Sequence, residues 1–226
     1  MSKSGLQTAN ERELNLVLPG QGKVVDFIVA NGDSNVLIDA KGVEMAQRGM
    51  VAFQRGDVRR ATQTSLIKAF EQGHEVAARI ASIGGDHPVI RQRSSTYLLA
   101  VTYKELYIGN GVTLAAVVGD AVLEKIRSKY AEQHLIPVEN IYFLTIHEFE
   151  ELMCLVTNKK IGIVEALEKA KQADSERITQ KFNFELHIHE WSKHLGREQP
   201  LRETLKSIVD EMRVAFPAQS KAMVQQ

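Results

Sequence analysis

Three charged residues interrupt two otherwise apolar segments in the first fifth of the sequence. Asp26 stands within "VVDFIVA", and Asp39 and Lys41 stand at the end of "NVLIDAK". Charged side chains are rarely buried unless they pair with each other or bind an ion. Two carboxylates can hold a hard divalent cation such as Mg²⁺, and a nearby ammonium can stabilise charge on a phosphate. The spacing therefore indicates metal-assisted hydrolysis of a phosphodiester.

The two segments that carry these charges are predicted to form an antiparallel hairpin. Residues 24–30 and 35–41 are rich in Val and Ile, and the "NGD" at positions 31–33 between them suits a tight turn. Side chains alternate between the two faces of a strand, so each charged residue has a defined side. The hairpin is thus the element that must position the chemistry.

The turn leaves two registers open. A loop made of Gly32 and Asp33 would set Asp26 directly opposite Asp39, whereas a loop one residue earlier would set Asp26 opposite Leu37. In both registers the three charged side chains project from the same face, and only an odd loop or a bulge would separate them. Two carboxylates directly opposite each other would repel, and a cation between them would remove that conflict.

The rest of the chain predicts an α/β fold with a mixed central sheet flanked by helices. The segment "NERELNLVLPG", residues 10–20, fits either a short helix or an extra strand. The later expected elements are a helix over 57–83, a strand over 97–103, a mostly helical stretch over 114–134, a strand over 140–145 with a helix after it, and a short strand at "ELHIHEW". We expect a core at residues 1–157 and a mainly helical C-terminal extension at residues 158–226.

Asp26, the short turn and the triplet Asp39-Ala40-Lys41 resemble the motif of the PD-(D/E)XK nuclease superfamily, which has the restriction-endonuclease-like fold. The resemblance spans roughly residues 20–150, and Val25 stands where the family name has proline. It implies that Asp26 and Asp39 bind Mg²⁺, with Mn²⁺ as a substitute, that the backbone carbonyl of Ala40 is a further ligand, and that Lys41 is the catalytic lysine.

The same resemblance implies a hydrolase that cuts nucleic acid, with DNA as the expected substrate, as an endonuclease of the defence, restriction or repair type. The alternative is a nuclease-like scaffold that has lost catalysis and binds nucleic acid or a protein partner. Cutting both strands of a duplex needs two active sites, which a homodimer would supply.

Accessory residues are expected on two helices that flank the hairpin. In the family a helix before the hairpin often supplies a glutamate, for which Glu11 and Glu13 are the candidates here. A polar residue often comes from the helix after the lysine, for which Gln63 and Lys68 are the candidates. Ordinary exposed helix polarity is the competing interpretation of both.

The overall composition sets limits on partners and location. Basic and acidic residues balance at 28 each, so no global field draws the protein to a polyanion, and phosphate contacts would come from a local patch such as Arg59 and Arg60. The single cysteine, Cys154, excludes a disulfide framework and suits a reducing cytoplasm. The sequence has no apolar signal core and no segment long enough to span a membrane.

Overall fold

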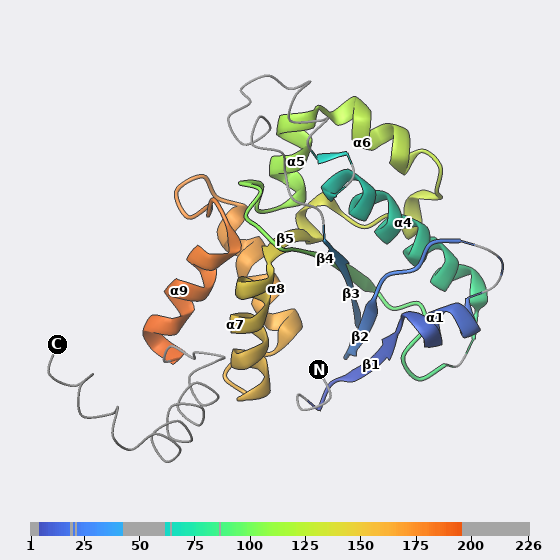
Figure 1. The fold of residues 1–226 in the computed structure, drawn as a ribbon, viewed down its shortest axis with the longest axis horizontal. Helices are drawn as coiled ribbons and strands as arrows, with labels where there is room; N and C mark the ends of the chain where they lie inside the picture. The colour runs from blue at the N-terminus through green and yellow to red at the C-terminus, as the bar shows by residue number, and fades with distance from the viewer. Residues whose placement is uncertain are drawn as a thin grey trace, which may run out of the picture.

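A five-stranded mixed sheet forms the centre of the fold (Figure 1). The computed structural model describes residues 5–18, 20, 22–42, 62–63, 65–85 and 87–195. The strands lie in the order of the sequence: β1 (Gln7–Asn10), β2 (Phe27–Asn31), β3 (Ser34–Lys41), β4 (Ser95–Thr102) and β5 (Ile141–Thr145). β1 pairs with β2, and β2 with β3, in antiparallel orientation, whereas β3 pairs with β4, and β4 with β5, in parallel orientation. The predicted α/β class with a mixed sheet is confirmed.

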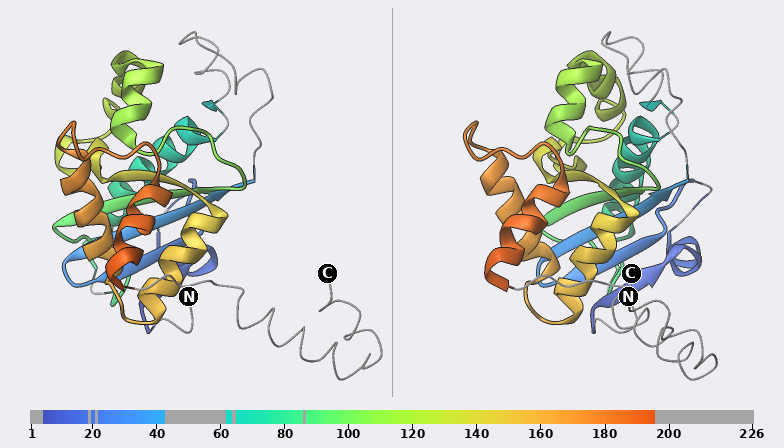
Figure 2. Two further views of the ribbon diagram at one scale, coloured as in Figure 1. Left: turned by 90° about the vertical axis from the view of Figure 1, so that its left-hand side faces the viewer. Right: turned by 60° about the vertical axis from the view of Figure 1, so that its left-hand side comes forward.

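Helices cover both faces of this sheet (Figure 2). The described helices are α1 (Glu11–Val17), α4 (Leu66–Ile83), α5 (Gly111–Val118), α6 (Asp120–Arg127), α7 (Ile146–Thr157), α8 (Ile163–Asp174) and α9 (Phe184–Leu195), with 3₁₀ turns at Glu132–His134 and Val138–Asn140. α1, α4, α5 and α6 share a core with one face of the sheet, and α7, α8 and α9 with the other. Within the described residues, no helix combines the length and the apolar character that crossing a membrane requires.

The hairpin of β2 and β3 adopts the first of the two predicted registers. Gly32 and Asp33 form the loop, Asn31 pairs with Ser34, and Gly32 has a φ of +58°, which glycine adopts without steric cost. The connection from β3 to β4 includes α4, and Lys41 at the end of β3 pairs with Thr102 at the end of β4. The carboxyl ends of the parallel strands therefore lie along one edge of the sheet.

A glycine lets α4 approach the sheet closely. A Cβ atom added to Gly73 would lie 2.7 Å from Cδ2 of Leu98, whose side chain is fully buried in β4. This distance is far below an ordinary van der Waals contact. The absence of a side chain at position 73 thus allows the neighbouring residues of α4 to reach β3.

The N-terminal segment contains both a strand and a helix. β1 was not predicted, while residues 11–17 adopt the helical alternative and bury Leu14 against the core. Asn10 and Glu13 form a capping box, in which each side chain accepts a hydrogen bond from the other residue's backbone N–H. This capping box fixes the point where β1 ends and α1 begins.

Two later predictions need correction. The stretch "ELHIHEW" is not a strand but part of α9, because Phe184, Ile188 and Trp191 recur at helical spacing and pack on the sheet. The stretch predicted as mostly helical over 114–134 is divided at Gly119, whose φ of +91° separates α5 from α6. α8 and α9 lie in the predicted C-terminal extension, yet they pack on the sheet; the boundary at residue 157 stays a prediction.

Candidate functional site

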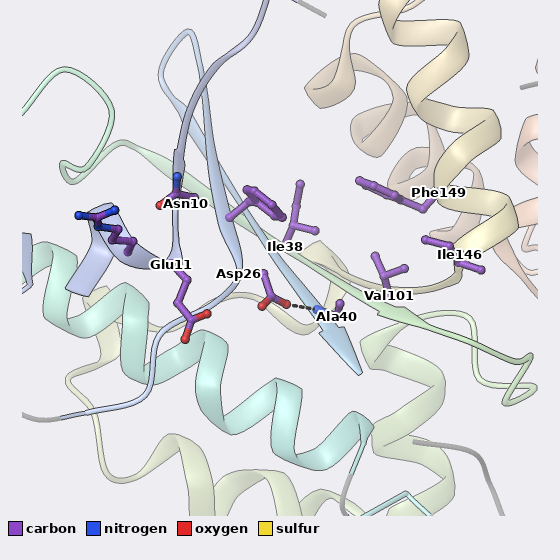
Figure 3. A pocket seen from close by; sticks show the side chains of 10 residues that line it. Asn10, Glu11, Asp26, Ile38, Ala40, Val101, Ile146 and Phe149 are labelled. Atoms are coloured by element: carbon purple, nitrogen blue, oxygen red, sulfur yellow. Dashed lines mark hydrogen bonds between the residues drawn. The ribbon is translucent and has the colours of Figure 1, made fainter. Parts of the chain in front are cut away.

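The candidate site lies where β2 and β3 separate. Phe27 and Ile38 are the last residue pair of the hairpin ladder, and Asp26 immediately precedes β2. The backbone N–H of Ala40 donates a hydrogen bond to Oδ2 of Asp26, with a donor–acceptor distance of 2.5 Å (Figure 3). The carboxylate thus takes the place of a backbone carbonyl where the ladder ends. The observed register, continued by one residue, sets Asp39 across from Asp26, as the first alternative predicts. Of the three side chains predicted on one face, Asp39 and Lys41 lie together against α4, whereas Asp26 lines a hollow with Ile38 and Ala40.

Asp39 and Lys41 form a buried ion pair on the face of β3 that packs against α4. Their side chains are 3% and 10% exposed, and Nζ of Lys41 contacts Oδ2 of Asp39. Burial raises the pKa of Asp39 above its ordinary value of 3.8; the Lys41 ammonium acts in the opposite direction, and the Asp26 carboxylate adds to the rise. All three predicted catalytic side chains therefore belong to one electrostatic unit.

Gln72 of α4 fixes the position of Lys41, and the sequence-based prediction missed it. Its Oε1 accepts a hydrogen bond from Nζ of Lys41 at 3.0 Å, and its Nε2 donates to the carbonyl of Val24. The residue is 9% exposed. A buried amide with both ends bonded holds the segment before β2 and the end of β3 in a fixed relation. The signal for it was a polar residue between Ala69 and Val76 on an apolar helix stripe.

The two accessory candidates on the helix after β3 differ in their relation to the site. Lys68 is exposed but close enough for its charge to lower the pKa of Asp39, as the smallest of several influences. Gln63 is exposed and, within the described part of the chain, makes no hydrogen bond to the other candidates. Arg59 and Arg60, the predicted phosphate contacts, lie outside the described residues.

The two glutamates of α1 also differ in their position relative to the site. Glu13 is engaged in the capping box with Asn10, whereas Glu11 lines the same hollow as Asp26 and Ala40 (Figure 3). Glu11 is therefore the better placed of the two as an accessory carboxylate.

The donor set suits a hard cation in chemistry but is engaged with internal partners. Asp26 and Asp39 supply carboxylate oxygens, and the carbonyl of Ala40 lies between them in the chain. Asp26 uses Oδ2 to accept from Ala40, and Asp39 pairs with Lys41. Over residues 5–195, as far as they are described, no group of three His, Cys, Asp or Glu side chains is close enough to hold a metal ion.

No protein-family model matches the chain, and no curated protein or solved structure is significantly similar to it. Support for a function therefore comes from the geometry of this site and from the motif resemblance.

Proposed function

We propose that the protein is a metal-dependent nuclease of the PD-(D/E)XK superfamily that hydrolyses phosphodiester bonds, with DNA as the expected substrate. One observation carries the proposal. An acid and an amine, Asp39 and Lys41, are buried as a pair at the end of a strand, and Asp26 lies across from them where the hairpin opens. A structural role alone gives little reason to bury such a pair, because apolar residues of similar size often stabilise a core equally well.

The order of elements agrees with this assignment. The motif residues lie on an antiparallel hairpin, a helix follows, and the next strand is parallel to β3. The sequence resemblance implies a hairpin, helix and strand in this order. The helix before β2 and the extra edge strand β1 complete the described N-terminal half.

Each residue has a role in the proposed reaction. Asp26, Asp39 and the Ala40 carbonyl would hold Mg²⁺, or Mn²⁺ in its place. The metal would supply Lewis acidity and a bound water of lowered pKa. The Lys41 ammonium would contact the phosphate and stabilise the negative charge that develops on it. Gln72 would keep that ammonium aimed at the strand end, because its amide oxygen bonds Nζ.

The present contacts define what metal binding must change. Oδ1 of Asp26 makes no hydrogen bond within the described residues, so it can accept a metal without breaking the bond to Ala40. Asp39 would exchange part of its contact with Lys41 for the cation, which frees the ammonium for phosphate. The raised pKa of Asp39 fits a carboxylate that burial leaves under-stabilised until a cation binds.

The test is a cleavage assay on supercoiled plasmid, linear single-stranded DNA and RNA, with Mg²⁺ or Mn²⁺ and an EDTA control. The informative variants are Asp39→Asn and Lys41→Met, which preserve size while removing charge. Asp120→Asn and Lys125→Met are matched controls, because both residues are exposed on α6, outside the site. Metal-dependent cleavage that is lost in the first two variants and retained in the controls supports the proposal. Equal cleavage by all four variants refutes the role of these residues.

The plasmid arm also addresses assembly. Linear product without a nicked intermediate indicates two coupled sites, as in a homodimer, whereas accumulation of nicked circles indicates a single site.

A second function is a catalytically inactive scaffold that binds nucleic acid or a protein. The observation in its favour is that Asp26 accepts a hydrogen bond from Ala40, and Asp39 pairs with Lys41, without a metal. Folded protein that binds nucleic acid yet cleaves no substrate with either metal would support this alternative over the nuclease.

A further inference from the structure

An open groove of about 830 Å³ lies beside Asp26, on the sheet face opposite to α4 (Figure 3). Its apolar lining comes from β2, β3, β4 and α7: Phe27, Ile38, Val101, Ile146 and Phe149. Ile38 and Val101 belong to the core that α7, α8 and α9 cover. Near the candidate site, the described helices thus leave this part of the sheet face open.

The groove exposes large apolar side chains. Phe27 is 39% exposed and Ile146 is 43% exposed, while Phe149 is half-buried. Contiguous exposed apolar surface on a protein commonly marks a place where another molecule binds. Two aromatic rings among the lining residues suit a flat, apolar ligand.

One end of the groove reaches Asp26 and Ala40 of the candidate site, whereas Asp39 and Lys41 lie on the other face of β3, against α4. Asp26 and Ala40 line the groove together with the apolar residues, so a molecule in the groove would contact these proposed metal ligands. Arg12, which is exposed, also lines the groove and offers a guanidinium of the kind that pairs with phosphate. The groove therefore combines an apolar surface, the guanidinium of Arg12 and, at one end, two of the proposed metal ligands.

We propose that this groove binds unpaired nucleobases of the strand whose phosphate lies at Asp26, so that the preferred substrate is single-stranded. This inference rests on the nuclease proposal. The faces of bases inside a duplex are stacked on their neighbours, whereas an unpaired base has a free face for Phe27 or Phe149. Aromatic stacking tolerates any base, so the groove confers a preference for strandedness rather than for sequence.

The experiment measures binding in EDTA, where cleavage is absent, by fluorescence anisotropy. The probes are a labelled oligothymidylate, an abasic strand with the same number of phosphates, and a duplex of the same length. We expect the oligothymidylate to bind on the order of tenfold more tightly than the abasic strand and the duplex, since each stacked base adds roughly that factor. Equal binding of all three probes, or tighter binding of the duplex, overturns the proposal.

Variants assign the effect to the groove. Phe27→Leu and Phe149→Leu remove the aromatic face but keep an apolar side chain, so each should weaken oligothymidylate binding on the order of tenfold and leave the abasic strand unchanged. Phe182→Leu is the matched control, because Phe182 is 57% exposed and lies outside the groove. Arg12→Gln should weaken both strands equally, because it acts on phosphate. Variants of Phe27 and Phe149 that bind like the control overturn the assignment.

These outcomes separate the two proposals. Base-dependent binding without any metal-dependent cleavage refutes the nuclease and keeps the groove as a binding site. Cleavage with no difference between the oligothymidylate and the abasic strand refutes the groove and keeps the nuclease.

Discussion

Replacement of Gln72 by leucine tests how the site is held together. The amide makes two buried hydrogen bonds, one from Nζ of Lys41 at 3.0 Å and one to the carbonyl of Val24. Leucine removes both hydrogen bonds and leaves the carbonyl of Val24 without its partner, while Lys41 keeps its ion pair with Asp39. The unsatisfied carbonyl of Val24 costs about 1–3 kcal/mol and the lost hydrogen bond to Lys41 about 1 kcal/mol more, so we expect a loss of about 2–4 kcal/mol in the free energy of unfolding. For a chain of this length that corresponds to roughly 4–16 °C in Tm.

Urea unfolding measures the stability loss, and steady-state cleavage measures the effect on the lysine. A less constrained ammonium should lower kcat by at least about tenfold with little change in KM, because positioning acts on the transition state. Gln72→Glu is the companion variant: it keeps an acceptor for Lys41 but sets a carboxylate against the carbonyl of Val24, so it should lose stability and retain more of kcat. If Gln72→Leu unfolds within about 0.5 kcal/mol of the parent, the inferred bridge is wrong.

Three further predictions address the charges and the packing. Asp26→Asn keeps an acceptor for the N–H of Ala40, so its free energy of unfolding should fall by less than about 1 kcal/mol, whereas Asp26→Ala should cost about 1–3 kcal/mol; equal losses in urea unfolding would contradict the hydrogen bond. Burial raises the pKa of Asp39, so in the metal-free chain its contribution to stability is largest below its unfolded pKa and is lost as the pH rises through the folded pKa. Because Mg²⁺ favours the ionised form, the Tm increase with Mg²⁺ should be larger at about pH 8 than at about pH 5, and should vanish with EDTA; a shift independent of pH would count against Asp39 as a ligand. Gly73→Ala should cost about 1–3 kcal/mol in urea unfolding through the clash with Leu98, and a neutral result would show that α4 can move away from the sheet.

The hairpin was predictable because local signals agree. The glycine at position 32 suits the turn, and side chains alternate between the two faces of a strand, so Asp39 and Lys41 lie on one side of β3. The observed register also selected one of the two alternatives that the turn residues left open. These features depend on residues close together in the sequence.

The missed features depend on partners distant in the sequence. β1 has no apolar alternation, and its pairing with β2 defines it as a strand. Gln72 lies 31 and 48 positions from the residues it bonds, so its role becomes visible only when α4 is packed on the sheet. In α9, His187 and His189 alternate with apolar neighbours, a pattern typical of a strand, but the segment is a helix in which His187 is buried beside Asp174.

The alternation of β3 places Ala40 in the groove and Lys41 on the opposite side of the sheet, against α4. A polymer that contacts both must turn sharply over the tip of this strand. Duplex DNA resists such curvature, since its persistence length is about 50 nm, whereas the backbone of a single strand is flexible. The alternation of side chains along one β-strand would then favour flexible single strands over stiff duplexes.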